Sequence, residues 1–171
     1  MHKSAGAMEG PSSPDRRAAA AGEPTRVYLD GLRAATEQAG IADRTRFLGE
    51  RRDIASVLLA ADIHCQPNLS PEPFGIAFVE ALTAGLPVVT TRLGAAPEIV
   101  EDGVCGLLTP PGDADALATA IGGLIADAAR RTALGSRGPA RATRLCDPAA
   151  RMKQLERRLL SLVGAGNQEE C

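Results

Sequence analysis

The sequence predicts an α/β fold, in which helices cover both faces of a parallel β-sheet. Short apolar runs alternate with longer segments whose apolar residues recur at helical spacing, as in strands connected by helices. The run 87–91 contains Val88-Val89 and no charge, which is typical of a strand buried on both faces. Gly40 and Gly85 follow helical segments, where glycine commonly ends a helix.

The first predicted element is a helix over residues 28–39. Its pattern directs Leu29 and Leu32 inward, and Gly40 is expected to stop it. Residues 46–48 then form a short run that is typical of a strand.

Three further elements, one helix and two strands, are expected between residues 53 and 91. Asp53 is expected to cap a helix, and strands are expected over 62–66 and 87–91. Ile54, Val57, Leu58 and Ala61 recur along the capped helix at helical spacing.

Between these two strands, the proline residues Pro71 and Pro73 favour an extended chain up to Gly75. A helix-length apolar stretch runs from there to Gly85, so a helix is expected to start near Gly75. Its first turn would present unpaired N–H groups and the positive end of the helix dipole, which suit a phosphate or a sugar hydroxyl. Gly75 would let a ligand approach this backbone closely.

Two carboxylates stand out in the same segment. Glu80 is the only charged residue between Pro73 and Thr91, and an unpaired buried carboxylate would be costly, so Glu80 is expected to face a cleft. Glu72 lies in the loop before the helix, and Glu80 follows about two turns into it. Because carboxylates accept hydrogen bonds from vicinal diols, the pair favours a ligand with hydroxyls at both ends and negative charge between, such as a nucleotide sugar.

Ligands of open parallel sheets bind beyond the carboxyl ends of the strands. The segments 68–72 and 92–98 follow two of the predicted strands and are therefore expected on the functional edge. Gly94 could bring a ligand near the backbone, or it could belong to an ordinary turn before a short helix started by Pro97.

The C-terminal part is predicted to consist of packing helices. Asp113 is expected to cap a helix whose apolar face is formed by Leu117, Ile121, Leu124 and Ile125. A final helix is expected over residues 152–163. Its apolar stripe, expected to be partly exposed, is Met152, Leu155, Leu159 and Leu162.

An ordered series of motifs is centred on an E-x7-E pattern from Glu72 to Glu80. Its other members include Arg46-Phe47-Leu48-Gly49, Ala60-Ala61-Asp62-Ile63, Gln66-Pro67-Asn68, Gly85-Leu86-Pro87-Val88-Val89 and Gly106-Leu107-Leu108. This series resembles the C-terminal, donor-binding half of the retaining GT-B glycosyltransferases, in the group often called glycosyltransferase family 4 or glycosyl transferases group 1. The resemblance covers residues 26–163 and implies a Rossmann-like sheet, incomplete at its N-terminus.

The resemblance also implies a function, which is hexosyl transfer from a UDP-, GDP- or ADP-sugar with retention of configuration and with no metal or other cofactor. Glu72 resembles the family carboxylate that contacts the donor sugar, and Glu80 the one that holds the ribose hydroxyls. No catalytic acid, base or nucleophile is assigned. The backbone that would cradle sugar and diphosphate is at Phe74, Gly75 and Ile76, and Gly94 is a possible member of a donor loop.

The domain expectation is a leader or remnant strand over 1–25, the donor-binding domain over 26–163 and a flexible tail over 164–171. The family's acceptor-binding half has no counterpart in the sequence, so a truncated donor-binding half is expected, whose own activity is open. The alternative is a non-catalytic nucleotide-sugar-binding or partner-binding subunit, with a separate chain supplying the other half. A dinucleotide-binding dehydrogenase is disfavoured, because no G-x-G-x-x-G follows an early strand.

Composition excludes several other classes. A chain of 171 residues with 44% hydrophobic content suits one globular domain. A net charge of -2 and an aromatic content of 2% disfavour nucleic acid as a partner. No apolar stretch reaches the roughly 20 residues that span a bilayer, and no signal peptide is evident. A cytoplasmic location is therefore expected, with peripheral contact at the inner face of the membrane left open.

The thiols and histidines indicate no metal site. The four cysteines form no C-x-x-C pair and are expected to be free, reduced thiols. His64 falls in a predicted buried strand, where a core histidine with satisfied hydrogen bonds is favoured over a catalyst.

Overall fold

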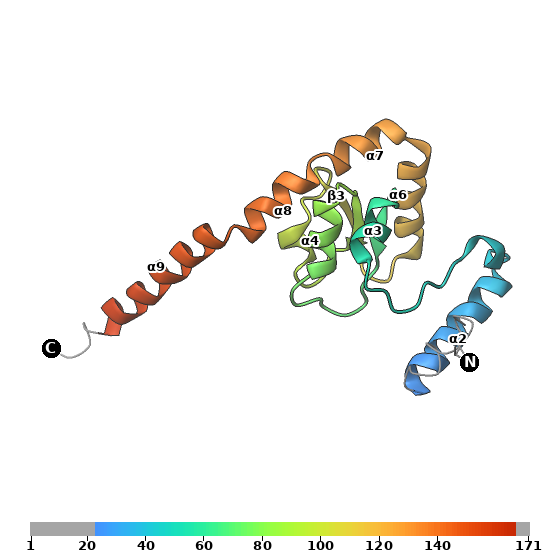
Figure 1. The fold of residues 1–171 in the computed structure, drawn as a ribbon, viewed down its shortest axis with the longest axis horizontal. Helices are drawn as coiled ribbons and strands as arrows, with labels where there is room; N and C mark the ends of the chain where they lie inside the picture. Colours follow the sequence, from blue (N-terminus) through green and yellow to red (C-terminus); the bar gives the residue numbers. More distant parts are fainter. Residues whose placement is uncertain (1–22, 167–171) are drawn as a thin grey trace, which may run out of the picture. The chain divides into compact units, whose positions relative to one another are not determined.

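The computed structural model describes residues 23–166, which divide into two compact units after Arg52 (Figure 1). Of the leader predicted over 1–25, residues 1–22 lie outside the described residues, as do residues 167–171 of the predicted tail. Residues 23–25 already belong to a helix. Residues 164–166 belong to the last helix.

The first unit contains the predicted N-terminal helix, α2 (Glu23–Gln38), and a short 3-10 helix, η1 (Ala42–Arg44). The helix begins earlier than expected and is followed by Gly40 at a φ of 66°, which confirms its stop. Leu29 is partly buried, but Leu32 is 39% exposed, so its predicted inward position is wrong. The described part of this unit holds no sheet against which the helix could bury that side chain.

The strand predicted over 46–48 is also wrong, because these residues form irregular chain. Phe47 and Leu48 are 38% and 53% exposed, and the Arg33 guanidinium lies 5.9 Å from the centre of the Phe47 ring. A strand needs a neighbour to complete its hydrogen-bond ladder, and no segment described in this unit pairs with it.

The second unit is built on a parallel sheet of β1 (His64–Gln66), β2 (Val88–Thr91) and β3 (Gly106–Thr109), in that order. The first two confirm the predicted strands in shortened form. The third was not predicted, since a four-residue strand that begins with glycine gives a weak pattern. Glycine is required at Gly106 because a Cβ there would lie 2.6 Å from the Val100 side chain and would also strike the Val88 carbonyl.

Helices cover both faces of this sheet, as predicted (Figure 1). Val88 packs in one core with Phe78 of α4 (Ile76–Thr83), whereas Val89 packs in a second core with Leu124 of α6 (Ala114–Ala126). The remaining helices of the unit are α3 (Ile54–Leu59), α5 (Ala96–Ile99), α7 (Ala128–Gly135), α8 (Gly138–Cys146) and α9 (Pro148–Gly166).

Asp53 and Asp113 both occupy the predicted N-cap positions, but only the side chain of Asp113 makes a capping hydrogen bond. The Asp113 carboxylate accepts a hydrogen bond of 2.8 Å from the Ala116 N–H, as expected. At Asp53 the side chain makes no capping hydrogen bond, and the backbone carbonyl accepts from the N–H of Ser56 at 3.0 Å instead.

The apolar face of α6 is narrower than predicted. Leu124 is fully buried and Leu117 and Ile121 are partly buried, but Ile125 is 66% exposed. The residue after a buried position is turned by about 100° around the helix axis, which carries Ile125 away from the sheet.

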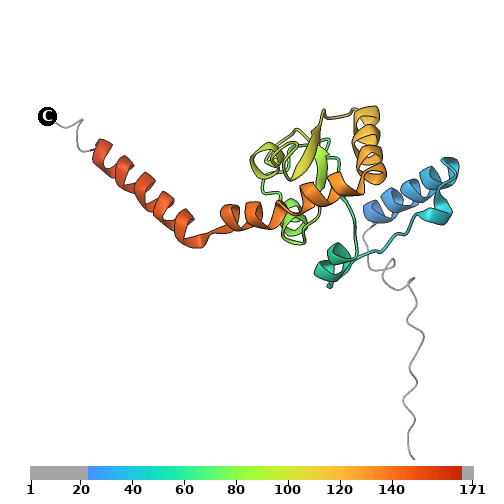
Figure 2. The same ribbon diagram turned by 90° about the horizontal axis from the view of Figure 1, so that it is seen from above.

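The chain continues through α7 and α8, which were not predicted, into α9, with a break at Asp147 between the last two helices (Figure 2). The helix α9 includes the predicted helix 152–163, and the expected exposure of its stripe is confirmed. Met152, Leu155, Leu159 and Leu162 are 64%, 50%, 54% and 70% exposed. Within residues 23–166 no helix is long and apolar enough to cross a membrane.

His64 in β1 departs from the expected satisfied core histidine. Its ring lies edge-on to the apolar Phe78 ring, with centroids 6.3 Å apart, and its Nε2 atom is buried without a hydrogen-bond partner. Burial lowers the pKa of His64, and hydrogen bonding with Gln66 and the charge of Glu80 oppose this only in part. The imidazole is therefore neutral near pH 7.

Packing of α8 on α4 generates a stability prediction. A Cβ at Gly138 would lie 2.6 Å from the Leu82 carbonyl oxygen, so Gly138→Ala is expected to lower the free energy of unfolding by about 1–3 kcal/mol. Gly122→Ala on α6 is the control, because its Cβ has nothing within 4 Å, and it should raise stability by about 0.5–1 kcal/mol. Urea denaturation measures both, and equal effects would contradict the proposed close packing.

The neutral state of His64 predicts a pH dependence of stability. Because folding lowers this pKa, the unfolded chain takes up the proton first as pH falls below 6.5, the ordinary value. The free energy of unfolding should therefore drop below that pH and level off below the folded-state pKa. Urea denaturation between about pH 7.5 and 5.5 should show a smaller slope in His64→Gln than in the unaltered chain. An unchanged slope in His64→Gln would refute this account.

Candidate functional site

The carboxyl ends of β1 and β2 bring two loops of the chain into contact. Thr91 donates a hydrogen bond of 2.7 Å from Oγ1 to the carbonyl oxygen of Asn68. Further along, the N–H of Ala95 donates to the carbonyl oxygen of Glu72 at 2.9 Å. The two segments that the sequence places on the functional edge are therefore joined through their backbones.

Gly94 makes this close contact possible. Its φ is 59°, and a Cβ at this position would lie 2.5 Å from the nitrogen and 2.7 Å from the carbonyl oxygen of Glu72. Packing of one loop on the other thus requires glycine here. A contact between Gly94 and a donor stays a prediction.

The helix α4 begins directly after Gly75, as predicted from the sequence. Gly75 is the N-cap residue with a φ of 64°, and a Cβ on it would lie 2.8 Å from Cδ2 of Phe78 and would also strike the Ile99 side chain. Conformation and packing both explain the glycine. The approach of a ligand to this backbone remains a prediction.

The carboxylate of Glu72 caps the start of α4. Its Oε1 atom accepts hydrogen bonds from the N–H of Gly75 at 3.1 Å and of Phe74 at 3.3 Å. A negative charge at a helix N-terminus is stabilised by the helix dipole. Two of the three amides predicted to cradle the donor are therefore bound to Glu72, while the N–H of Ile76 has no partner among the described residues.

Glu80 lies on the exposed side of α4, at the rim of two cavities. The first has a volume of ≈ 320 Å³ and lies between α3 and α4, with an aliphatic lining that includes Leu58 and Val79. The second, of ≈ 640 Å³, is bordered by α4, α5, α8 and the start of α9. Phe74 and Ile76 also border the second cavity and are 78% and 66% exposed. A ligand in either cavity could donate a hydrogen bond to Glu80.

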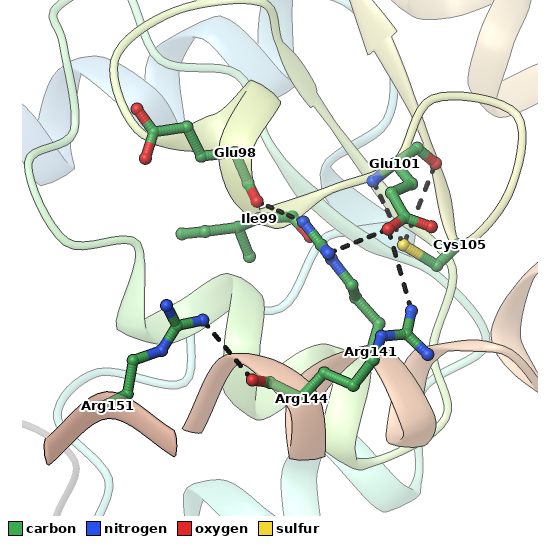
Figure 3. A network of polar contacts seen from close by, with 7 residues as sticks. All are labelled: Glu98, Ile99, Glu101, Cys105, Arg141, Arg144 and Arg151. Carbon is green, nitrogen blue, oxygen red and sulfur yellow. Dashed lines mark hydrogen bonds and ion pairs between the residues drawn. The ribbon is translucent and has the colours of Figure 1, made fainter. Parts of the chain in front are cut away.

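The sequence reasoning missed Arg141, which reaches from α8 to the end of α5 (Figure 3). Its Nε atom donates to the Ile99 carbonyl oxygen at 3.0 Å, its Nη2 atom donates to the Glu98 carbonyl oxygen, and its Nη1 atom lies 2.9 Å from Oε1 of Glu101. The side chain is 19% exposed. No sequence pattern distinguishes it from the neighbouring arginines.

The cysteine thiols in the described residues are free. Cys65, Cys105 and Cys146 are free, and Cys171 lies outside the described residues. Burial raises the pKa of the Cys65 and Cys105 thiols, which keeps them protonated near pH 7. Among residues 23–166, no group of three or more His, Cys, Asp or Glu side chains is arranged to hold a metal ion.

The chain is similar in sequence to several bacterial glycosyltransferases. The phosphatidyl-myo-inositol mannosyltransferase of Mycolicibacterium smegmatis is 39% identical over 133 residues, which is 76% of this chain and 34% of that protein. The D-inositol 3-phosphate glycosyltransferase of Mycobacterium marinum is 41% identical over 133 residues, 74% of this chain and 28% of that protein. The chain thus spans about a third of the length of these relatives.

The chain is also similar in fold to solved structures. Anabaena HepE in complex with UDP-glucose superposes with a TM-score of 0.72 and 36% identity, over 82% of this chain and 38% of HepE. Sucrose-phosphate synthase from Thermosynechococcus elongatus superposes with a TM-score of 0.67 and 33% identity, over 90% of this chain and 38% of that enzyme. The predicted Rossmann-like α/β fold is confirmed.

A family profile described as "Glycosyl transferases group 1" matches residues 7–141. The match includes both loops at the carboxyl edge of the sheet and the whole of α4 with its two carboxylates. The recognition made from the E-x7-E series is confirmed, and the chain belongs to the group 1 glycosyltransferases.

Proposed function

We propose that this chain binds a nucleotide sugar at the carboxyl edge of its sheet and presents it for glycosyl transfer with retention of the anomeric configuration. The main support for the proposal is the start of α4, where the N–H of Ile76 is available to a ligand. The capping carboxylate of Glu72 precedes this N–H in the chain, and the exposed carboxylate of Glu80 follows it. A UDP-glucose complex is known for HepE, which shares this fold.

Glu80 is the proposed acceptor for the ribose hydroxyls. It is exposed and borders both cavities, so a nucleoside can reach it from either side of α4. An ionised carboxylate has two oxygens and can accept a hydrogen bond from each hydroxyl of a vicinal diol. This geometry favours a ribose over a ligand with a single hydroxyl.

Glu72 is the proposed acceptor for a hydroxyl of the donor sugar. Its Oε1 atom is held by the amides of Phe74 and Gly75, whereas no hydrogen bond to its Oε2 atom is found in the described residues. The two amide bonds would orient the carboxylate and leave Oε2 available to the sugar. Gly94 would contribute by holding this loop in place.

The diphosphate is proposed to lie near the Ile76 N–H, where the positive end of the α4 dipole favours an anion. Transfer breaks the bond between the anomeric carbon and the diphosphate oxygen and forms a bond from that carbon to an acceptor hydroxyl, whose proton is lost. Negative charge grows on the departing nucleoside diphosphate, and preorganised N–H donors stabilise it. The part played by these residues is therefore positioning and charge stabilisation.

The roles of the carboxylates generate a binding prediction. Glu80→Gln keeps the shape of the side chain but removes its charge, so donor affinity should fall about tenfold or more, as for a lost charge-assisted hydrogen bond. Calorimetric titration with UDP-, GDP- and ADP-glucose measures the change and identifies the preferred base.

The matched control is Glu156→Gln on the exposed surface of α9, which should bind as the unaltered chain does. Equal losses in both variants, or binding that is unaffected by Glu80→Gln, would remove Glu80 from the site. Donor binding without release of nucleoside diphosphate, when an acceptor is supplied, would favour a non-catalytic binding subunit.

A further inference from the structure

The short helix α5 ends with backbone carbonyl groups that its single turn cannot pair. Arg141 supplies their donors, because its planar guanidinium bonds the carbonyl oxygens of Glu98 and Ile99 and pairs with the carboxylate of Glu101 (Figure 3). One side chain thus binds two carbonyl oxygens at the end of α5 and the carboxylate of Glu101, two residues beyond the helix.

The other end of α5 is held by the loop that carries Glu72. The Ala95 N–H donates to the Glu72 carbonyl oxygen at 2.9 Å, and Gly94 lies so close to Glu72 that no side chain would fit between them. The Ile99 side chain also lies directly over Gly75. A shift of α5 would therefore displace the backbone on which the Glu72 carboxylate and its amide partners depend.

Arg141 itself projects from a firmly placed helix. One turn before it, Gly138 lies against the backbone of Leu82 in α4, at a distance that leaves no room for a methyl group. The helix α4 also carries Glu80. The path from Glu80 through α8, Arg141 and α5 to Glu72 consequently links the two carboxylates through contacts outside their own segment.

We infer that Arg141 is a positioning residue of the donor site, which fixes the Glu72 carboxylate relative to Glu80 by holding α5 between α8 and the Glu72 loop. The expected effect of Arg141 on affinity for a nucleotide sugar rests on the proposed donor-binding function. The positioning itself is a property of the chain that can be measured without a ligand.

Two neighbouring arginines provide matched controls. Arg144 approaches the same Glu101 carboxylate at 3.8 Å, is 62% exposed and makes no contact with the carbonyls of α5. Arg151 donates from Nε to the Leu145 carbonyl oxygen at 3.1 Å, so it holds the end of α8 rather than α5. A loss of charge or of an arginine bond in general would affect these variants too.

The first experiment measures hydrogen exchange of the backbone amides by NMR in the full 171-residue chain without a sugar. Arg141→Gln is expected to reduce the protection of the Gly75 and Ala95 amides about tenfold, whereas Arg144→Gln and Arg151→Gln should leave it unchanged. Equal protection in Arg141→Gln and the unaltered chain, or the same loss in Arg144→Gln, would overturn the inference.

The second experiment titrates Arg141→Gln, Arg141→Lys and the Arg144→Gln control with UDP-glucose, GDP-mannose and ADP-glucose by calorimetry; Arg151→Gln is left out because Arg151 lines the second cavity beside Glu80. Arg141→Gln should weaken binding about tenfold, and it should add no further weakening when Glu72→Gln is already present, because its effect passes through Glu72. Additive losses would show that Arg141 acts by another route. Arg141→Lys keeps the charge but not the planar set of donors, so it should recover less than half of the lost binding free energy.

The two experiments separate the possible failures. If the unaltered chain binds none of these sugars, the proposed function fails, while the exchange data still decide the positioning role. If Arg141→Gln does not fold, Arg141→Lys takes its place in both measurements, with the same amides and the same controls. Unchanged protection and unchanged affinity in Arg141→Lys would then count against the inference.

Discussion

The structure depends on the complete burial of β2 between two strands and two helical layers. Val88 and Val89 project to opposite faces, so one strand supplies both cores of the second unit. The strand then ends in buried threonines whose hydroxyls donate to the carbonyls of Gln66 and Asn68, each at 2.7 Å. The same strand that organises the core therefore also fixes the loop after β1, at the edge where the candidate site lies.

Close approach of other atoms to two glycines gives this edge its shape, with backbone atoms of Glu72 at Gly94 and side chains of Phe78 and Ile99 at Gly75. Gly94 and Gly75 have positive φ values and stand where a Cβ would strike a neighbour. Close backbone approach leaves little freedom for the Glu72 loop. Arg141 extends this arrangement to a third element, α8, because its guanidinium can satisfy several carbonyl oxygens at once.

The start of α4 shows how one helix terminus can serve two purposes. Its dipole favours negative charge, and the Glu72 carboxylate already accepts hydrogen bonds from the amides of Phe74 and Gly75. A bound diphosphate would add further negative charge to the same turn. The hydrogen bonds that hold Glu72 therefore matter twice in the proposed function, since they orient the carboxylate and also reduce its repulsion of the donor.

The sequence by itself determined the α/β class, the strands around His64–Gln66 and Val88–Thr91, the start of α4 at Gly75 and the family, because these follow from local periodicity, glycine positions and motif order. It misplaced residues 46–48 and Ile125, since ladder partners and helix faces are decided by distant segments. Only the tertiary structure showed the contact of Gly94 with Glu72 and the reach of Arg141 to α5. Both join residues far apart in the chain, so no local pattern records them.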